Sequence, residues 1–169
     1  FHRVFYTVGN REMGIHPSEA TVYPDSVAKL HAIFAACDEL EVDVCPAAIC
    51  EGVFVVPLLS WYNAEFDELD PAVDQQLQFD TLCRWPIDVD RQVWKYMLKL
   101  NEEHLKLPLG GTVLTFSHFL PRRGLPFNTM TEIGTKAAKF MGCQGIDDQL
   151  RAVGSKLHVY GHSRVRYDG

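Results

Sequence analysis

Three apolar runs in this chain each end in a short polar segment whose side chains can bind a metal ion or transfer a proton. The runs and the segments that follow them are 4–8 with Gly9-Asn10-Arg11-Glu12, 112–116 with Ser117-His118, and 157–160 with Gly161-His162-Ser163-Arg164. Each run is rich in β-branched and aromatic residues, which predicts a strand. A sheet fixes side chains at the ends of its strands, while the loop beyond stays open to substrate. The pattern therefore predicts an α/β chain with a reaction site at its strand ends.

The remaining segments predict further helices and strands. Pro24-Asp25-Ser26 starts a helix whose apolar residues repeat at helical spacing. Two short strands, 42–49 and 53–59, flank Glu51-Gly52 and predict a hairpin. Because no repeat, low-complexity tract or linker interrupts the chain, residues 1–169 are expected to form a single domain. Helices are also expected at 132–141, at 147–153 and, capped by Asp88 or Asp90, up to Lys106.

Composition narrows the classes of function. With 169 residues, 47% of them apolar and 22% charged, the chain can bury a core of its own. The net charge of −6 argues against a nucleic-acid partner, since duplex binding needs a clustered basic surface, but it is compatible with a small phosphorylated substrate. Five cysteines without a Cys-x-x-Cys pair indicate reduced, buried thiols instead of a disulfide framework or a zinc knuckle.

The start of the chain and the length of its apolar runs bear on where the protein is located in the cell. No run is long enough to span a membrane. The chain opens at Phe1 inside a strand-like run, so we expect a partial chain without its first strands, in which an upstream targeting signal would be invisible. A cytoplasmic location is favoured, and the sequence assigns no oligomeric state.

In order and in composition, the three polar segments resemble the motifs of the calcineurin-like metallophosphoesterases, which are Gly-Asn-His-Asp/Glu, a lone His after a strand, and Gly-His-x-His. The resemblance covers nearly the whole chain and implies a four-layer αββα sandwich of the α/β (α+β) class. It also implies phosphoester hydrolysis with two divalent transition metals, Mn, Zn or Fe. Further segments resemble a eukaryotic branch of plants, algae and protists: Pro57-Leu58-Leu59-Ser60-Trp61-Tyr62, Cys83-Arg84-Trp85-Pro86 and Thr115-Phe116-Ser117-His118-Phe119-Leu120-Pro121-Arg122.

Carried over residue by residue, the resemblance makes Asn10, His118 and His162 ligands of the second metal. Arg11 stands where the family has the histidine that assists at the leaving group, and Arg164 where it has a ligand of the first metal. Arginine stays protonated and has no acceptor lone pair, so it can neither bind a metal nor act as an acid, yet it can hold a phosphate oxygen. The upstream carboxylate motifs Asp-x-His and Gly-Asp-x-x-Asp are absent from the chain. We therefore expect fewer than two metals, and a weakened phosphatase or phosphodiesterase acting on a small phosphorylated substrate or a phosphoprotein.

Each of these interpretations has a structural alternative. A chain that kept the fold and lost the chemistry would be a catalytically inactive protein-interaction module. Trp61 and Tyr62 either wall a substrate pocket or belong to the core. The acidic segment 65–74 either binds a cation or forms a solvated surface. The other histidines lack a comparable context and are expected to be surface or packed residues: His2, His16, His31, His104 and His158.

Overall fold

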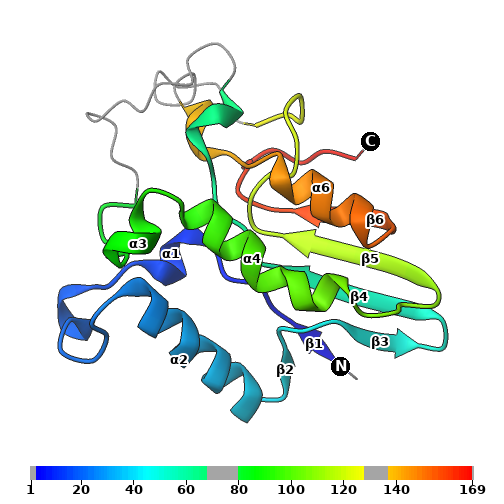
Figure 1. The fold of residues 1–169 in the computed structure, drawn as a ribbon, viewed down its shortest axis with the longest axis horizontal. Helices are drawn as coiled ribbons and strands as arrows, with labels where there is room; N and C mark the ends of the chain where they lie inside the picture. Colours follow the sequence, from blue (N-terminus) through cyan, green and yellow to red (C-terminus); the bar gives the residue numbers. More distant parts are fainter. Residues whose placement is uncertain (1–2, 68–79, 128–136, 169) are drawn as a thin grey trace.

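The computed structural model of the chain describes residues 3–67, 80–127 and 137–168 and has a mixed α/β architecture with two sheets (Figure 1). In the smaller sheet, β1 (Val4–Phe5) lies parallel to β2 (Val42–Asp43). In the larger sheet, β3 is antiparallel to β4, whereas β4, β5 and β6 are parallel. The predicted combination of helices and sheets is confirmed. The strands of the larger sheet, in spatial order, are β3 (Ala47–Cys50), β4 (Val53–Leu58), β5 (Thr112–Ser117) and β6 (Ser155–Tyr160).

Helices connect the parallel strands. α2 (Ser26–Glu39) links β1 to β2, while α4 (Val93–Leu105) follows β4 and α6 (Gly145–Ala152) follows β5. α4 and α6 lie together against the larger sheet (Figure 1). Parallel strands joined by such crossovers place their carboxyl ends at one edge of the sheet. The short helical segments among the described residues are α1 (Asn10–Met13), α3 (Ile87–Asp90), η1 (Pro17–Glu19), η2 (Ala64–Phe66) and η3 (Ala137–Phe140).

The two faces of the larger sheet differ in what covers them. Val56 and Leu58 of β4 are 0% exposed and belong to the core that also includes Met97 of α4. Side chains alternate along a strand, so the register places Leu157 and Val159 of β6 on the opposite face. These two side chains are 56% and 59% exposed. The helices therefore cover one face, and the described residues leave part of the other, apolar face open to solvent.

The predicted strand 42–49 is wrong in extent, because it is two strands in different sheets. β2 ends at Asp43, and β3 begins only after Val44-Cys45-Pro46. Proline has no N–H to contribute to a sheet, which explains a break at this position. The hairpin is confirmed, since β3 and β4 are antiparallel on either side of Glu51-Gly52, with Gly52 in the left-handed region at φ +69°.

Two predicted helices also need correction. α3 ends at Asp90 and α4 begins at Val93, so the helix predicted from Asp88 or Asp90 is broken near its start. The helix predicted at 132–141 lies largely outside the described residues, and its described part is the single turn η3. Most of the acidic segment 65–74 also lies outside them. The helix after Asp25 is confirmed, and its first turn is capped because the Asp25 carboxylate accepts the N–H of Ala28 at 2.8 Å.

A buried amide ties the end of β4 to both covering helices. Asn101 of α4 is 1% exposed. Its Oδ1 accepts the N–H of Leu59 at 2.9 Å, and its Nδ2 donates to the carbonyl of Leu59 at 2.8 Å and to Oε1 of Gln149 in α6 at 2.7 Å. These bonds fix the position of the backbone directly after β4. They therefore also limit the positions of Trp61 and Tyr62, which follow Leu59 by two and three residues.

Candidate functional site

The three residues predicted as metal ligands lie together at the carboxyl ends of the strands. Nε2 of His118 is 3.0 Å from Oδ1 of Asn10 and 3.0 Å from Nδ1 of His162. His118 directly follows β5, and His162 lies two residues beyond the end of β6. Asn10 begins α1, and the chain before it is held beside β4 because Oγ1 of Thr7 donates to the carbonyl of Leu58 at 2.9 Å. The structure thus brings together the side chains that the three motifs predict.

Glycines allow the backbone to pass close to His118. A Cβ atom at Gly9 would lie 2.7 Å from both Cε1 and Nδ1 of the His118 ring. A Cβ atom at Gly161 would lie 3.3 Å from the His118 carbonyl oxygen, which accepts the N–H of Gly161 at 3.1 Å. Close packing around the central histidine therefore requires glycine at position 9 and leaves little room for a side chain at position 161.

Both imidazoles rest on a buried aromatic ring. The His118 ring meets Phe119 edge-on at 4.8 Å and 88°, and the His162 ring is tilted over Phe119 at 4.6 Å. Phe119 is 0% exposed and contacts Trp61 and Tyr62 at centroid distances of 5.4 and 5.5 Å. Trp61 is 4% exposed, so it belongs to the core. It packs against Phe119, which in turn contacts both histidines.

Electrostatics favour neutral imidazoles. Burial lowers the pKa of His118, and the carboxylates of Glu12 and Asp80 oppose this effect only in part. Burial also lowers the pKa of His162, and together with the smaller effects of His118, Arg164 and Arg11 it brings this pKa to about 4. Both side chains are therefore uncharged at neutral pH, which is the form that binds a metal ion.

The geometry of the three side chains fits a divalent cation. Oδ1 of Asn10 can only accept a hydrogen bond, and Nε2 of His118 offers either one N–H or one lone pair to its two neighbours. In either tautomer of His118, Nε2 can therefore make only one of these two contacts a well-directed hydrogen bond. Two ligand atoms about 2.1 Å from one ion and at right angles to each other lie about 3.0 Å apart, which is the distance from His118 Nε2 to Asn10 Oδ1 and to His162 Nδ1. An ion would accept a lone pair from each of the three atoms.

Two arginines, Arg11 and Arg164, lie near this cluster. Arg11 is on α1 and Arg164 follows His162, and both side chains are exposed. Both positive charges contribute to the low pKa of His162. His162 and Arg164 have left-handed backbone conformations, at φ 61° and 54°. The arrangement places cations on the solvent side of the cluster, where they can bind an anionic group.

Sequence reasoning missed two carboxylates at the cluster. Oδ1 of Asp80 accepts a hydrogen bond from Nδ2 of Asn10 at 2.6 Å. Oε2 of Glu12 accepts the N–H of Gly9 at 2.9 Å and so stabilises the first turn of α1. Glu12 has a sequence signal, because it ends the motif after Gly9. Asp80 has none, since it lies 70 residues from Asn10 along the chain.

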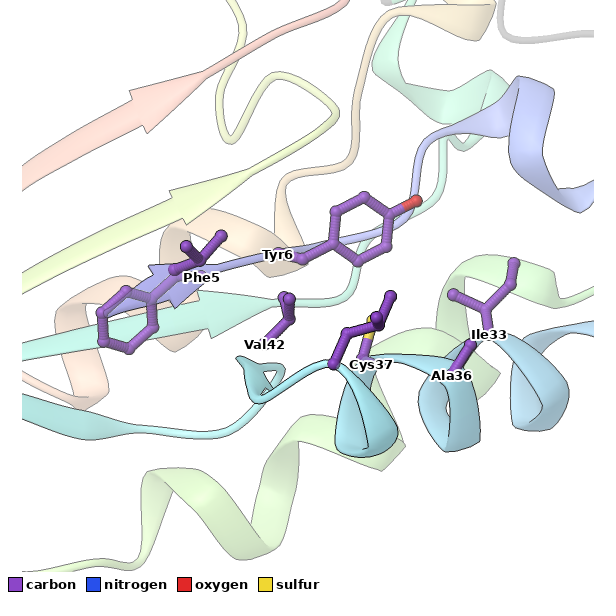
Figure 2. Close-up of a pocket in the computed structure, with 8 residues that line it drawn as sticks. Phe5, Tyr6, Ile33, Ala36, Cys37 and Val42 are labelled. Carbon is purple, nitrogen blue, oxygen red and sulfur yellow. The ribbon is translucent and has the colours of Figure 1, made fainter. Parts of the chain in front are cut away.

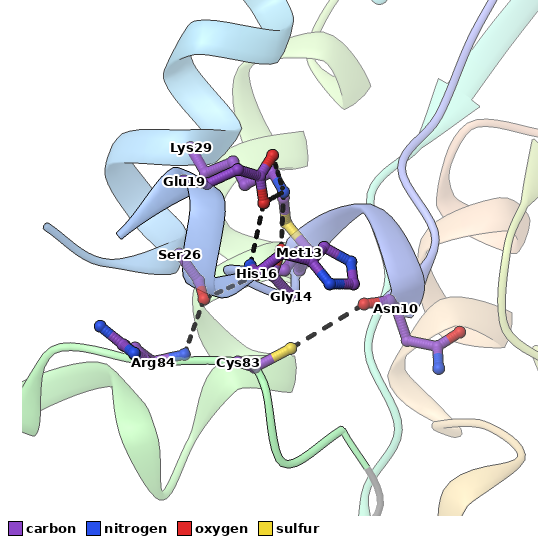
Figure 3. A network of polar contacts seen from close by, with 9 residues as sticks. All are labelled: Asn10, Met13, Gly14, His16, Glu19, Ser26, Lys29, Cys83 and Arg84. Carbon is purple, nitrogen blue, oxygen red and sulfur yellow. Dashed lines mark hydrogen bonds and ion pairs between the residues drawn. The ribbon is translucent and has the colours of Figure 1, made fainter. Parts of the chain in front are cut away.

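Buried polar contacts hold α1 and the turn after it against α2 (Figure 3). Nζ of Lys29 donates to the carbonyl of Gly14 at 2.6 Å and pairs with Glu19 at 2.8 Å. Oγ of Ser26 donates to the carbonyl of Met13 at 2.8 Å. Lys29 and Ser26 are 8% and 0% exposed. Because these carbonyls belong to the last residue of α1 and to the residue after it, the contacts limit how far Asn10 can move relative to the sheet.

An apolar cavity of about 320 Å³ lies elsewhere, between the smaller sheet and α2 (Figure 2). Its lining includes Phe5 of β1, Tyr6 directly after it, and Ile33 and Cys37 of α2. None of the cluster residues lines it. The cavity therefore does not belong to the candidate site.

No family model, no curated protein and no solved structure matches this chain. None of the helices in the described part of the chain has the length and apolar content that a membrane crossing requires. Across the described ranges, no group of three or more His, Cys, Asp or Glu side chains is placed to hold a metal ion. Among the described residues, the cluster contributes two imidazoles and one amide.

Replacing Gly9 with alanine should displace the His118 ring. Gly9 has φ −104°, which alanine adopts freely, so the effect comes only from the added methyl group. Overpacking of this kind costs about 1–3 kcal/mol in the free energy of unfolding. Urea unfolding and the NMR shifts of the His118 ring measure the two effects.

Gly110→Ala is the matched control, because a Cβ atom there meets nothing within 4 Å. It should change neither the free energy of unfolding nor the ring shifts. Equal stability of Gly9→Ala and the wild type, with unchanged His118 resonances, would contradict the close packing described above.

Proposed function

We propose that this chain is a metal-dependent phosphoester hydrolase, either a phosphatase or a phosphodiesterase. The observation that carries the proposal is that His118 Nε2 lies 3.0 Å from Asn10 Oδ1 and 3.0 Å from His162 Nδ1. Neutral imidazoles and an amide oxygen suit Mn, Zn or Fe. Two exposed arginines beside the metal ligands suit a phosphate group.

The resemblance to calcineurin-like metallophosphoesterases supports the same proposal, because the motifs occur in the family's order. The larger sheet has helices on one face and exposed apolar residues on the other. A face of this kind is suited to packing against a second sheet about 10 Å away. This supports a four-layer αββα sandwich as the finer description of the fold.

In the proposed reaction, Asn10, His118 and His162 hold a divalent ion, which when bound supplies Lewis-acid polarisation of the phosphoryl group. Arg11 and Arg164 hold phosphate oxygens and offset the charge that develops on them. Arg11 cannot protonate the leaving group, because its guanidinium stays charged at working pH. Esters whose leaving groups need no proton are therefore the better substrates.

Arg164 also sets the number of ions. A guanidinium has no lone pair, so it cannot replace the ligand that the family places there. Its fixed charge, near His162, opposes a second cation close by. The proposed centre therefore holds about one ion per chain.

A second candidate function is a catalytically inactive interaction module of the same fold. The two arginines favour it, since each removes a histidine that the family uses. The limited ligand set favours it too, because the described residues group no three His, Cys, Asp or Glu side chains. Metal content and turnover separate the two candidates.

The wild-type protein should retain about one equivalent of Mn²⁺ or Zn²⁺ after dialysis, and His118→Ala and His162→Ala should retain far less. Each substitution removes one imidazole ligand from the cluster. Elemental analysis gives the stoichiometry and isothermal titration calorimetry gives the affinity. His31→Ala is the control, because His31 is exposed on α2. Two firmly bound equivalents would contradict the role of Arg164, and none would contradict the hydrolase.

Arg11→His should raise turnover of alkyl phosphates more than that of aryl phosphates. A restored general acid contributes about 10²–10⁴-fold where the leaving group needs a proton, and an aryl oxide needs little help. Steady-state kinetics on one substrate of each type, with Mn²⁺ supplied, measures the difference. Arg91→His, at an exposed position between α3 and α4, is the control. If Arg11→His/Arg164→His is folded and metal-loaded but hydrolyses neither substrate, the interaction module replaces the hydrolase.

A further inference from the structure

We infer that Asp80 is a positioning residue of the candidate metal centre, a role that rests on the function proposed above. Its Oδ1 lies 2.6 Å from Nδ2 of Asn10, while Oδ1 of Asn10 faces His118 Nε2 at 3.0 Å. The carboxylate thus contacts one end of the Asn10 amide, and the histidine contacts the other end. Asp80 acts on the ion only through Asn10.

The chemistry of the amide explains why it needs such a partner. The oxygen and the NH₂ group of asparagine have nearly the same shape, and a half-turn of the side chain exchanges them. An ionised carboxylate only accepts hydrogen bonds, so Asp80 selects the orientation in which NH₂ faces it. The same choice presents the oxygen to His118, whose Nε2 also contacts His162. In the reversed orientation, N–H groups would point at the position of the ion and would repel it.

Asp80 is itself held in place. Its carbonyl accepts the N–H of Cys83 at 2.9 Å, which closes a turn, and Sγ of Cys83 lies 3.8 Å from the carbonyl of Asn10. One turn therefore contacts both the side chain and the backbone of Asn10. Tyr62 is stacked on Trp61 at 5.3 Å and is hydrogen-bonded to the Asp80 side chain. Burial is the main cause that raises the pKa of the Tyr62 phenol, and the Asp80 carboxylate raises it further.

The backbone at Asp80 determines which substitutions test the role. Asp80 has φ 59°, a left-handed conformation that asparagine and glycine adopt more readily than other residues. Asp80→Asn keeps the shape and removes the charge, and Asp80→Gly removes the side chain without adding backbone strain. Alanine would add strain of its own and would confuse the result.

In the full chain, Asp80→Asn and Asp80→Gly should bind Mn²⁺ about 10- to 100-fold more weakly than the wild type, which is the range for losing the partner of a metal ligand. Isothermal titration calorimetry measures the affinity, and thermal unfolding shows whether each variant is folded. Asn10→Asp/Asp80→Asn exchanges donor and acceptor. It presents an oxygen to the ion in either orientation and should recover most of the affinity. Asp38→Asn, at an exposed position on α2, is the matched control.

The side-chain amide of Asn10 gives a second readout that needs no metal. In metal-free wild-type protein, a charge-assisted hydrogen bond should shift one NH₂ proton of Asn10 strongly downfield, and Asp80→Asn should abolish that shift. An ion bound equally tightly by wild type and Asp80→Asn would overturn the positioning role and leave the hydrolase standing. A lowered melting temperature with unchanged affinity would overturn it in the same way. A wild type that binds no ion would overturn the proposed function and the positioning role together.

Discussion

The parallel register of β5 and β6 is the constraint on which the candidate site depends. Ser117 and Tyr160 are partners at the ends of these strands, so the chain leaves both strands at one edge and in one direction. His118 and His162 therefore come side by side, with their rings 5.0 Å apart. A slip of one residue would turn a strand's side chains to the other face and separate the two imidazoles. The core beneath α4 and α6 stabilises this register, because it buries one face of the larger sheet.

Asn10 reaches the same edge by a different route. It lies in α1 rather than in the larger sheet, so its position depends on contacts that cross between parts of the chain. Buried Lys29 and Ser26 hold the turn after α1 against α2, and Gly9 leaves room for the His118 ring. Two side chains thus come from strand ends and the third from a helix that buried hydrogen bonds hold in place. The chemistry proposed here needs all three supports.

The sequence predicts the parts of this arrangement that follow from local pattern. Strand propensity and the polar residues directly after each run are enough to place His118 and His162 at strand ends. The start of α4 at Val93 depends on what the helix packs against, which local pattern does not encode, whereas the break at Pro46 follows from the proline itself. Asp80 is the clearest omission, because its contact with Asn10 arises only from the fold of the intervening chain. Whether Trp61 walls a pocket or belongs to the core likewise depends on tertiary packing.

The central claim is that Asn10, His118 and His162 bind one divalent ion between them. The most direct measurement is a crystal structure of the chain soaked in Mn²⁺ or Zn²⁺, with the ion located by its anomalous scattering. We expect a peak about 2.0–2.3 Å from Asn10 Oδ1, His118 Nε2 and His162 Nδ1. A map with no ion at these atoms, in crystals where the three side chains keep their mutual contacts, would contradict it.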